Sequence, residues 1–137
     1  MKTANLTLVS LLMVSIASWA DYRADVFEQG SGKSKKLYTF EHKSTPAEDG
    51  EKTVAVFKDL EGNVVFEEKV TLRGTELVKS EISQNQTKQS AVVEVKEGKV
   101  FFSKTIDGKT KTSEEKLGNT FVMTGNFQKF IQKNWAD

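Results

Sequence analysis

The sequence predicts a mainly β fold: an antiparallel meander, forming a curved open sheet or half-barrel, with one C-terminal amphipathic helix. Three observations predict it. Apolar and polar residues alternate along most of the 137-residue chain, glycine-containing turns separate the alternating stretches, and a helical period appears only near the C-terminus. A chain of this length is enough for one domain with a modest core.

The first twenty residues predict a secretory signal peptide. Lys2 is the only charge before an apolar stretch at 6–17, and Ser18-Trp19-Ala20 supplies small residues at both positions that a signal peptidase reads. As a helix this stretch spans about 18 Å, too short for a hydrocarbon core of about 30 Å. We therefore expect cleavage after Ala20, no stable membrane anchor, a periplasmic or extracellular bacterial location, and a single β-rich domain at 21–137.

Composition limits the classes of function. The chain has no cysteine, so disulfides do not stabilise it, whatever its compartment. Of its 20 basic residues only Lys2 lies in the leader, so the cleaved chain carries as many basic as acidic residues. Nucleic-acid binding draws on a basic excess that displaces counterions from phosphates. We therefore predict no nucleic-acid partner.

The first three strands are expected at 22–28, 37–43 and 53–58. Each shows alternation with period two, and the second places Tyr38, Phe40 and His42 on one face. The sequence between the second and third strands contains the only proline, at position 46. We expect that segment to be a loop.

The next two strands are expected at 64–73 and 75–83, with a turn at Gly74 between them. The first has an apolar face that Glu68 interrupts. A β-bulge near Glu67 would resolve that conflict, because one extra residue shifts the following side chains to the other face.

Three further strands are expected at 91–95, 100–106 and 109–115. A Glu-Gly dipeptide at 97–98 and an Asp-Gly dipeptide at 107–108 separate them, and Asp-Gly favours the positive φ angles of a type I′ hairpin turn. The third stretch is polar on both faces. It is therefore expected to be a solvated edge strand protected by its charges.

The C-terminal part is expected to contain one more short strand at 120–124 and then a helix at about 126–136. Asn126 is the expected N-cap. Apolar residues of the helix recur at i, i+3, i+4 and i+8 and form a single stripe. The stripe consists of Phe127, Phe130, Ile131 and Trp135.

In layout the chain resembles an uncharacterised class of exported bacterial β-rich proteins. The shared features are a leader, a meander with Asp-Gly and Glu-Gly hairpins, and a short helix ending near an Asn-Trp pair, here Asn134-Trp135. The resemblance implies a curved sheet similar to lipoprotein-carrier folds, in which further strands follow the helix. This sequence lacks that second half, so the resemblance implies that it corresponds to the N-terminal part of such a protein.

Candidate catalytic and metal-binding motifs are weak. Residues 31–34 read Ser-Gly-Lys-Ser, but Phe27 stands where a phosphate-binding loop needs its first glycine. His42 is the only histidine, and the adjacent Glu41 points to the opposite face of its strand. One histidine and no cysteine do not make a structural zinc site. We predict no catalytic residue, no metal site and no cofactor.

Apolar residues on both faces of some strands are the remaining signal, with the consecutive Phe101 and Phe102 as an example. Either internal elements cover the second face, or that face binds something apolar. The sequence therefore predicts a non-enzymatic binding domain for a lipid, another hydrophobic small molecule or a cell-envelope protein. An assembly module that pairs through the edge strand 109–115 is the first alternative and a hydrolase the second. The candidate ligand-binding residues are Tyr38, Phe40, Phe66, Phe101, Phe102 and Trp135, each of which could instead serve core packing.

Overall fold

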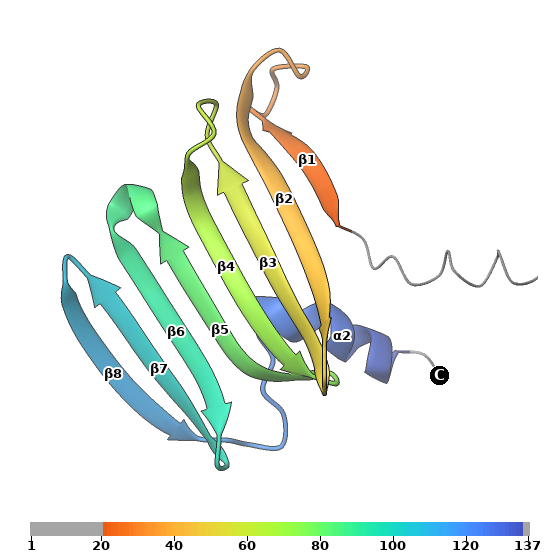
Figure 1. Ribbon diagram of the computed structural model, residues 1–137, viewed down its shortest axis with the longest axis vertical. Helices are drawn as coiled ribbons and strands as arrows, with labels where there is room; N and C mark the ends of the chain where they lie inside the picture. The colour runs from red at the N-terminus through yellow and green to blue at the C-terminus, as the bar shows by residue number, and fades with distance from the viewer. Residues whose placement is uncertain (1–20, 136–137) are drawn as a thin grey trace, which may run out of the picture.

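The computed structural model describes residues 21–135, and within them the chain forms one open eight-stranded sheet and one α-helix (Figure 1). All strands are antiparallel and follow one another in sequence order, which confirms the predicted fold class. The predicted leader lies outside the described residues. The elements are β1 (Tyr22–Phe27), β2 (Lys36–Ala47), β3 (Gly50–Lys58), β4 (Val64–Arg73), β5 (Glu76–Gln84), the 3-10 turn η2 (Asn85–Thr87), β6 (Gln89–Lys96), β7 (Lys99–Ile106), β8 (Lys109–Lys116) and α2 (Thr124–Asn134).

Two-residue turns set the register of the C-terminal strands. Glu97 and Gly98 have φ angles of 52° and 72°, and Asp107 and Gly108 have 49° and 76°. Two successive positive φ values are the requirement of a type I′ turn, whose twist matches that of the flanking strands. Both predicted hairpins are therefore confirmed.

The segment around Pro46 is strand, and the loop predicted there is wrong. Strand β2 continues to Ala47 and pairs Pro46 with Glu51 of β3. Strand β1 pairs with β2 only as far as His42, so beyond that point β2 has no second neighbour among residues 21–135. A missing N–H is tolerated on such a free edge, where no ladder bond is lost.

The bulge predicted near Glu67 is also absent. Strand β4 keeps a regular register through Glu67 and Glu68 with both neighbours, and its register shifts occur instead opposite Lys58 and between Thr71 and Leu72. Glu68 stays on the apolar face because that face offers its carboxylate a hydrogen-bond donor. The Ser80 hydroxyl of β5 donates a 3.2 Å hydrogen bond to its carboxylate.

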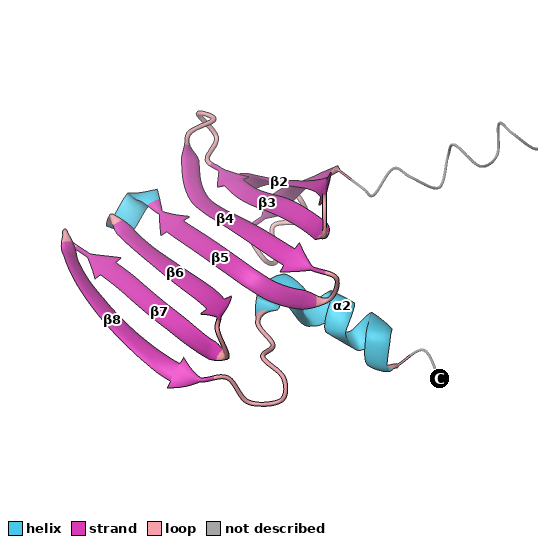
Figure 2. Ribbon diagram, turned by 60° about the horizontal axis from the view of Figure 1, so that its bottom comes forward, coloured by secondary structure: helices cyan, strands magenta, loops and turns pink. Residues whose placement is uncertain are grey.

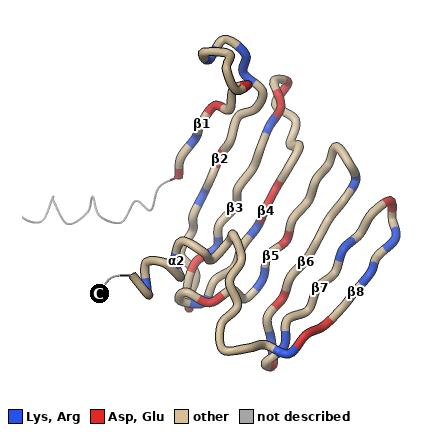
Figure 3. Tube along the Cα trace, turned by 180° about the vertical axis from the view of Figure 1, so that it is seen from behind, with Lys and Arg blue, Asp and Glu red and all other residues tan. Residues whose placement is uncertain are grey.

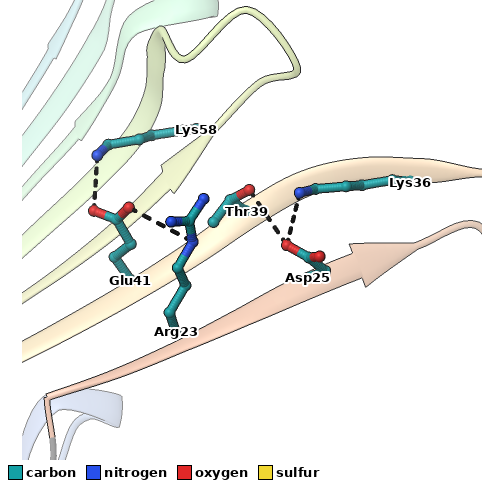
Figure 4. Close-up of polar contacts among 6 residues, drawn as sticks. All are labelled: Arg23, Asp25, Lys36, Thr39, Glu41 and Lys58. Carbon is teal, nitrogen blue, oxygen red and sulfur yellow. Dashed lines mark hydrogen bonds and ion pairs between the residues drawn. The ribbon is translucent and has the colours of Figure 1, made fainter.

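The sheet has two chemically different faces. Helix α2 lies against one of them, here called the helix-side face (Figure 2). The opposite, outer face carries ion pairs between neighbouring strands. Lys58 Nζ lies 2.7 Å from Glu41 and Lys36 Nζ lies 2.7 Å from Asp25 (Figure 4). These hydrogen-bonded lysines hold the pKa of each carboxyl below its usual value.

Both signs of charge are interspersed over the strands, without a broad area of one sign (Figure 3). This arrangement agrees with the balanced composition of the chain. A mixed surface of this kind favours solubility but gives no extended field to attract a polyanion.

The core lies between the helix-side face and the C-terminal segment. Five buried residues from four strands form its centre, and residues of the segment after β8 pack against them. The approach of the helix is close at Gly125, where a Cβ would lie 2.7 Å from a methyl carbon of Val70. The buried cluster consists of Val70, Leu72, Leu77, Val93 and Val100.

Residues 120–123 do not form the predicted strand. The segment after β8 runs back past the neighbouring strands toward β5 (Figure 1), so it crosses the sheet and pairs with none of the eight described strands. Helix α2 then begins at Thr124, two residues earlier than predicted. The N-cap is Met123, so the prediction that Asn126 is the N-cap is wrong. Asn126 lies in the first turn instead, where its Oδ1 accepts a 2.7 Å bond from the Met123 N–H and its Nδ2 donates to the Phe121 carbonyl at 3.0 Å.

The helix is rotated relative to its predicted apolar stripe. Phe127 and Trp135 are 55% and 76% exposed, whereas Asn126 is only 2% exposed. The reason is the close contact at Gly125 and the two hydrogen bonds of Asn126, which turn that side of the helix toward the sheet. No helix within residues 21–135 is long and apolar enough to span a membrane.

Candidate functional site

The structure distributes the candidate ligand-binding residues over three places. Tyr38, Phe40, Phe66 and Phe102 lie on the helix-side face, as the pairing of their strands requires. Phe101 lies on the outer face, because it directly precedes Phe102 in β7. Trp135 follows the last residue of α2. Within the first group, Tyr38, Phe40 and Phe66 lie on β2 and β4, whereas Phe102 lies on β7, three strands from β4.

Four aromatic rings from β1 to β4 form a continuous line on the helix-side face, here called the aromatic row. Phe40 and Phe57 have centroids 4.8 Å apart, and Phe57 and Phe66 are 5.9 Å apart in an edge-to-face arrangement. Tyr22 extends the row to the sheet edge, 5.5 Å from Phe40. These separations are those of favourable aromatic pairs.

The row exists because of the strand register. Phe40 is directly opposite Phe57, which is directly opposite Phe66. Tyr22 and Phe57 were missed as candidates although both show period-two alternation within predicted strands. Alternation assigns a side chain to a face, whereas the partner across the ladder depends on turn length and bulges.

The row is not covered by the helix. Helix α2 contacts the strand ends near Gly50, through Glu51 and Val70, while the row crosses β3 and β4 near the opposite hairpin. The three phenylalanines of the row are half-buried rather than buried. Aromatic surface therefore faces the solvent on this side of the sheet.

Phe101 and Phe102, the consecutive pair that suggested two apolar faces, serve two different environments. Phe102 lies 6.2 Å from the ring of Phe121 and packs against the core cluster. On the outer face, the ammonium group of Lys96 lies 5.1 Å from the ring centroid of Phe101. A lysine over an aromatic ring supplies both apolar cover and a cation–π contact.

A pocket of about 240 Å³ lies beside the aromatic row, between the sheet and α2. Its floor includes Ala55, whose small side chain lies between His42 and Glu68 on the neighbouring strands. Strands β1 to β4 and the first two turns of the helix supply the walls. The lining residues are Tyr22, His42, Glu51, Thr53, Ala55, Glu68, Val70, Leu72, Thr124, Gly125, Gln128 and Lys129.

Glu51 joins the sheet to the helix at this pocket. Its carboxylate is 3.0 Å from Lys129 Nζ of α2 and accepts a hydrogen bond from the Ser44 hydroxyl. Burial alone would raise the pKa of Glu51, but the Ser44 and Lys129 hydrogen bonds outweigh it and hold this pKa below its ordinary value. Glu51 is therefore ionised and engaged at neutral pH.

Glu68 and His42 are less completely satisfied. The half-buried Glu68 accepts one bond from Ser80 and forms no ion pair with any residue in 21–135. The Nδ1 atom of His42 is buried without a hydrogen-bond partner within the same range, and its ring stacks on Tyr22 at 5.0 Å. The pocket thus offers polar groups that an additional molecule could engage.

A second pocket, of about 210 Å³, lies on the other side of α2, where Phe130 and Asn126 face Leu77 and Phe121. Trp135 lines neither pocket. Residues 21–135 contain no group of three or more histidine, cysteine or carboxylate side chains that could hold a metal ion.

No family model matches the chain, and no curated protein and no solved structure matches it significantly.

Proposed function

We propose that this protein is an exported, non-enzymatic binding domain that holds an apolar ligand, such as a lipid chain, against the helix-side face of its sheet. The aromatic row carries this proposal. An open line of rings next to a pocket provides a long apolar contact surface with polar groups at one end, which is the usual composition of a small-molecule site.

The chemistry around His42 supports binding rather than hydrolysis. General-base catalysis by histidine relies on a second group that orients the ring through its other nitrogen. His42 Nδ1 has no such partner among the described residues, and the ring is stacked flat on Tyr22. These features suit a site wall better than a proton acceptor.

The ligand proposal is tested by native mass spectrometry of gently purified protein and by titration with the neutral apolar dye Nile red. We expect a co-purified lipid mass, and dye fluorescence that falls strongly in Phe57→Ala. The matched control is Phe101→Ala, which removes the same ring from the outer face and should bind dye normally. A bare protein mass together with equal dye binding by both variants would refute the proposal.

Export is tested separately. The intact mass of protein recovered outside the cytoplasm should correspond to a chain that begins at Asp21, as cleavage after Ala20 requires. Recovery of the uncleaved chain from the cytoplasm alone would contradict export.

The edge-strand alternative has its own support. Every residue of β8 is exposed, and no strand in the described part of the chain pairs with its outer edge. Its backbone groups therefore support strand addition by a partner. A second copy of the chain is the simplest partner. If β8 mediates self-association, the double variant Thr110→Asp/Thr112→Asp should abolish it in sedimentation experiments, whereas unchanged sedimentation would reject this alternative.

A further inference from the structure

We infer that the ligand of the aromatic row carries a positive charge, and that its ammonium group binds in the pocket beside Glu68. This inference rests on the proposed function and adds the charge of the ligand head group. It assigns the site to amphiphilic organic cations, with an apolar tail along the row and a cationic head in the pocket.

The position of Glu68 is the first argument. The residue lies on the helix-side face two positions from Phe66 on β4, with Ala55 opposite it on β3 and Ile82 opposite it on β5. A half-buried carboxylate among apolar neighbours is expensive unless a donor or cation compensates it. Within residues 21–135 the only partner is the Ser80 hydroxyl at 3.2 Å. A cationic ligand would provide the missing compensation.

The charge balance of the pocket is the second argument. Its lining contains two carboxylates, Glu51 and Glu68, but only one ammonium group, that of Lys129. Lys129 lies 3.0 Å from Glu51, so the surplus negative charge is located at Glu68. An anionic head such as a carboxylate would meet this surplus unfavourably, whereas an ammonium group would neutralise it.

The aromatic surroundings are the third argument. Tyr22 lines the pocket. The ring centroids of Tyr22 and Phe40 are 5.5 Å apart. The faces of aromatic rings attract cations, and quaternary ammonium groups are commonly recognised by rings of this kind. The pocket of about 240 Å³ is smaller than the usual site for a drug-sized ligand. It therefore suits a compact head group, with the tail lying outside along the open row.

The experiment compares three probes that share one octyl chain: octyltrimethylammonium, octanol and octanoate. Calorimetric titration of the purified protein should show octyltrimethylammonium binding at least about tenfold more tightly than octanoate, as expected for a charge-assisted contact. In Glu68→Gln this preference should disappear. Glutamine can still accept the Ser80 hydrogen bond, so the fold should persist.

Glu67→Gln is the matched control, because Glu67 is adjacent to Glu68 on β4 but points to the outer face, where it pairs with Lys69 at 2.8 Å. This variant should retain the preference. Nuclear magnetic resonance of the unmodified protein provides an independent reading: octyltrimethylammonium should shift the signals of Tyr22, His42 and Ala55 but not those of Phe101.

The outcomes separate the two proposals. Equal binding of all three probes overturns the cation inference and leaves the apolar-ligand proposal standing. A preference that persists in Glu68→Gln, or signal shifts confined to Phe101, also overturns the inference. If none of the probes binds, both proposals fail.

Discussion

The two ends of the helix-side face have similar sequence patterns but different environments. On β4, Leu72 lies beneath the C-terminal segment and is 3% exposed, whereas Phe66, six residues earlier on the same face, is only half-buried. Cover by α2 and the segment before it makes the difference. Apolar side chains stabilise a fold in proportion to the surface they remove from water, so the covered end contributes mainly to stability and the aromatic row keeps surface for a ligand.

Side-chain truncation at the covered end and in the aromatic row should show the largest difference between these two regions. Leu72→Ala should lower the free energy of unfolding by about 2–5 kcal/mol, because it removes buried methyl groups and leaves a cavity. Phe57→Ala removes a larger side chain but should lower it by less than about 2 kcal/mol, since the ring is already partly hydrated. Urea unfolding measures both. Equal losses would mean that the row is part of the core.

The contact between helix and sheet gives the next largest effect. In Gly125→Ala the added Cβ would lie 2.7 and 3.0 Å from the two Val70 methyl carbons. This overpacking should lower the free energy of unfolding by about 1–3 kcal/mol. Val70→Ala should relieve part of this effect in the double variant. A double-mutant cycle measures that coupling, and strictly additive losses would show that the helix does not press on β4.

Acid should weaken the attachment of the helix at Glu51. The pKa of Glu51 is lower in the folded chain, so the carboxylate contributes stability above its unfolded pKa and loses it as the pH falls through the folded value. The effect should stay under about 1 kcal/mol. Unfolding at pH 7 and in acid should show a difference between the wild type and Glu51→Gln only at pH 7.

His42, Glu68 and Lys129 line the same pocket as Glu51, so the control variant for this pH comparison is taken from outside the pocket. Glu67→Gln is that control, because it removes a carboxylate from the outer face. A stability difference between the wild type and Glu51→Gln that is unchanged in acid would contradict a role for the ionised Glu51.

Substitutions on the outer face should change stability least. Glu41 forms ion pairs with the largely exposed Arg23 and the partly exposed Lys58, and ion pairs that reach the solvent add little to stability. Glu41→Gln should therefore leave the thermal unfolding midpoint unchanged within error, and added salt should not alter that result. A loss as large as that of Leu72→Ala would show that the outer face also holds the sheet together.

Much of the fold could be predicted because its signals are local. Period-two alternation identifies strands from a few residues, and Asp107-Gly108 encodes a hairpin turn through its own φ preferences. The polar edge strand β8 was likewise visible in its charges. Each of these properties depends on neighbouring residues only.

What could not be predicted depends on contacts between distant residues. Pro46 lies in a strand because β1 pairs with β2 only as far as His42, and Glu68 keeps its face because Ser80 of the neighbouring strand donates a hydrogen bond to it. The rotation of α2 follows from Gly125 meeting Val70 and from the hydrogen bonds of Asn126. The aromatic row has the same origin, since register across three hairpins brings its rings together.

The sequential order of the strands also has a kinetic consequence. Each of the eight strands pairs only with its neighbours in the chain, so every pairing closes a short loop at low entropic cost. The contact order is therefore low for an all-β protein, which favours rapid folding. Strands can be added one at a time, starting at β1, and the docking of α2 then buries the core residues of β4 and β5.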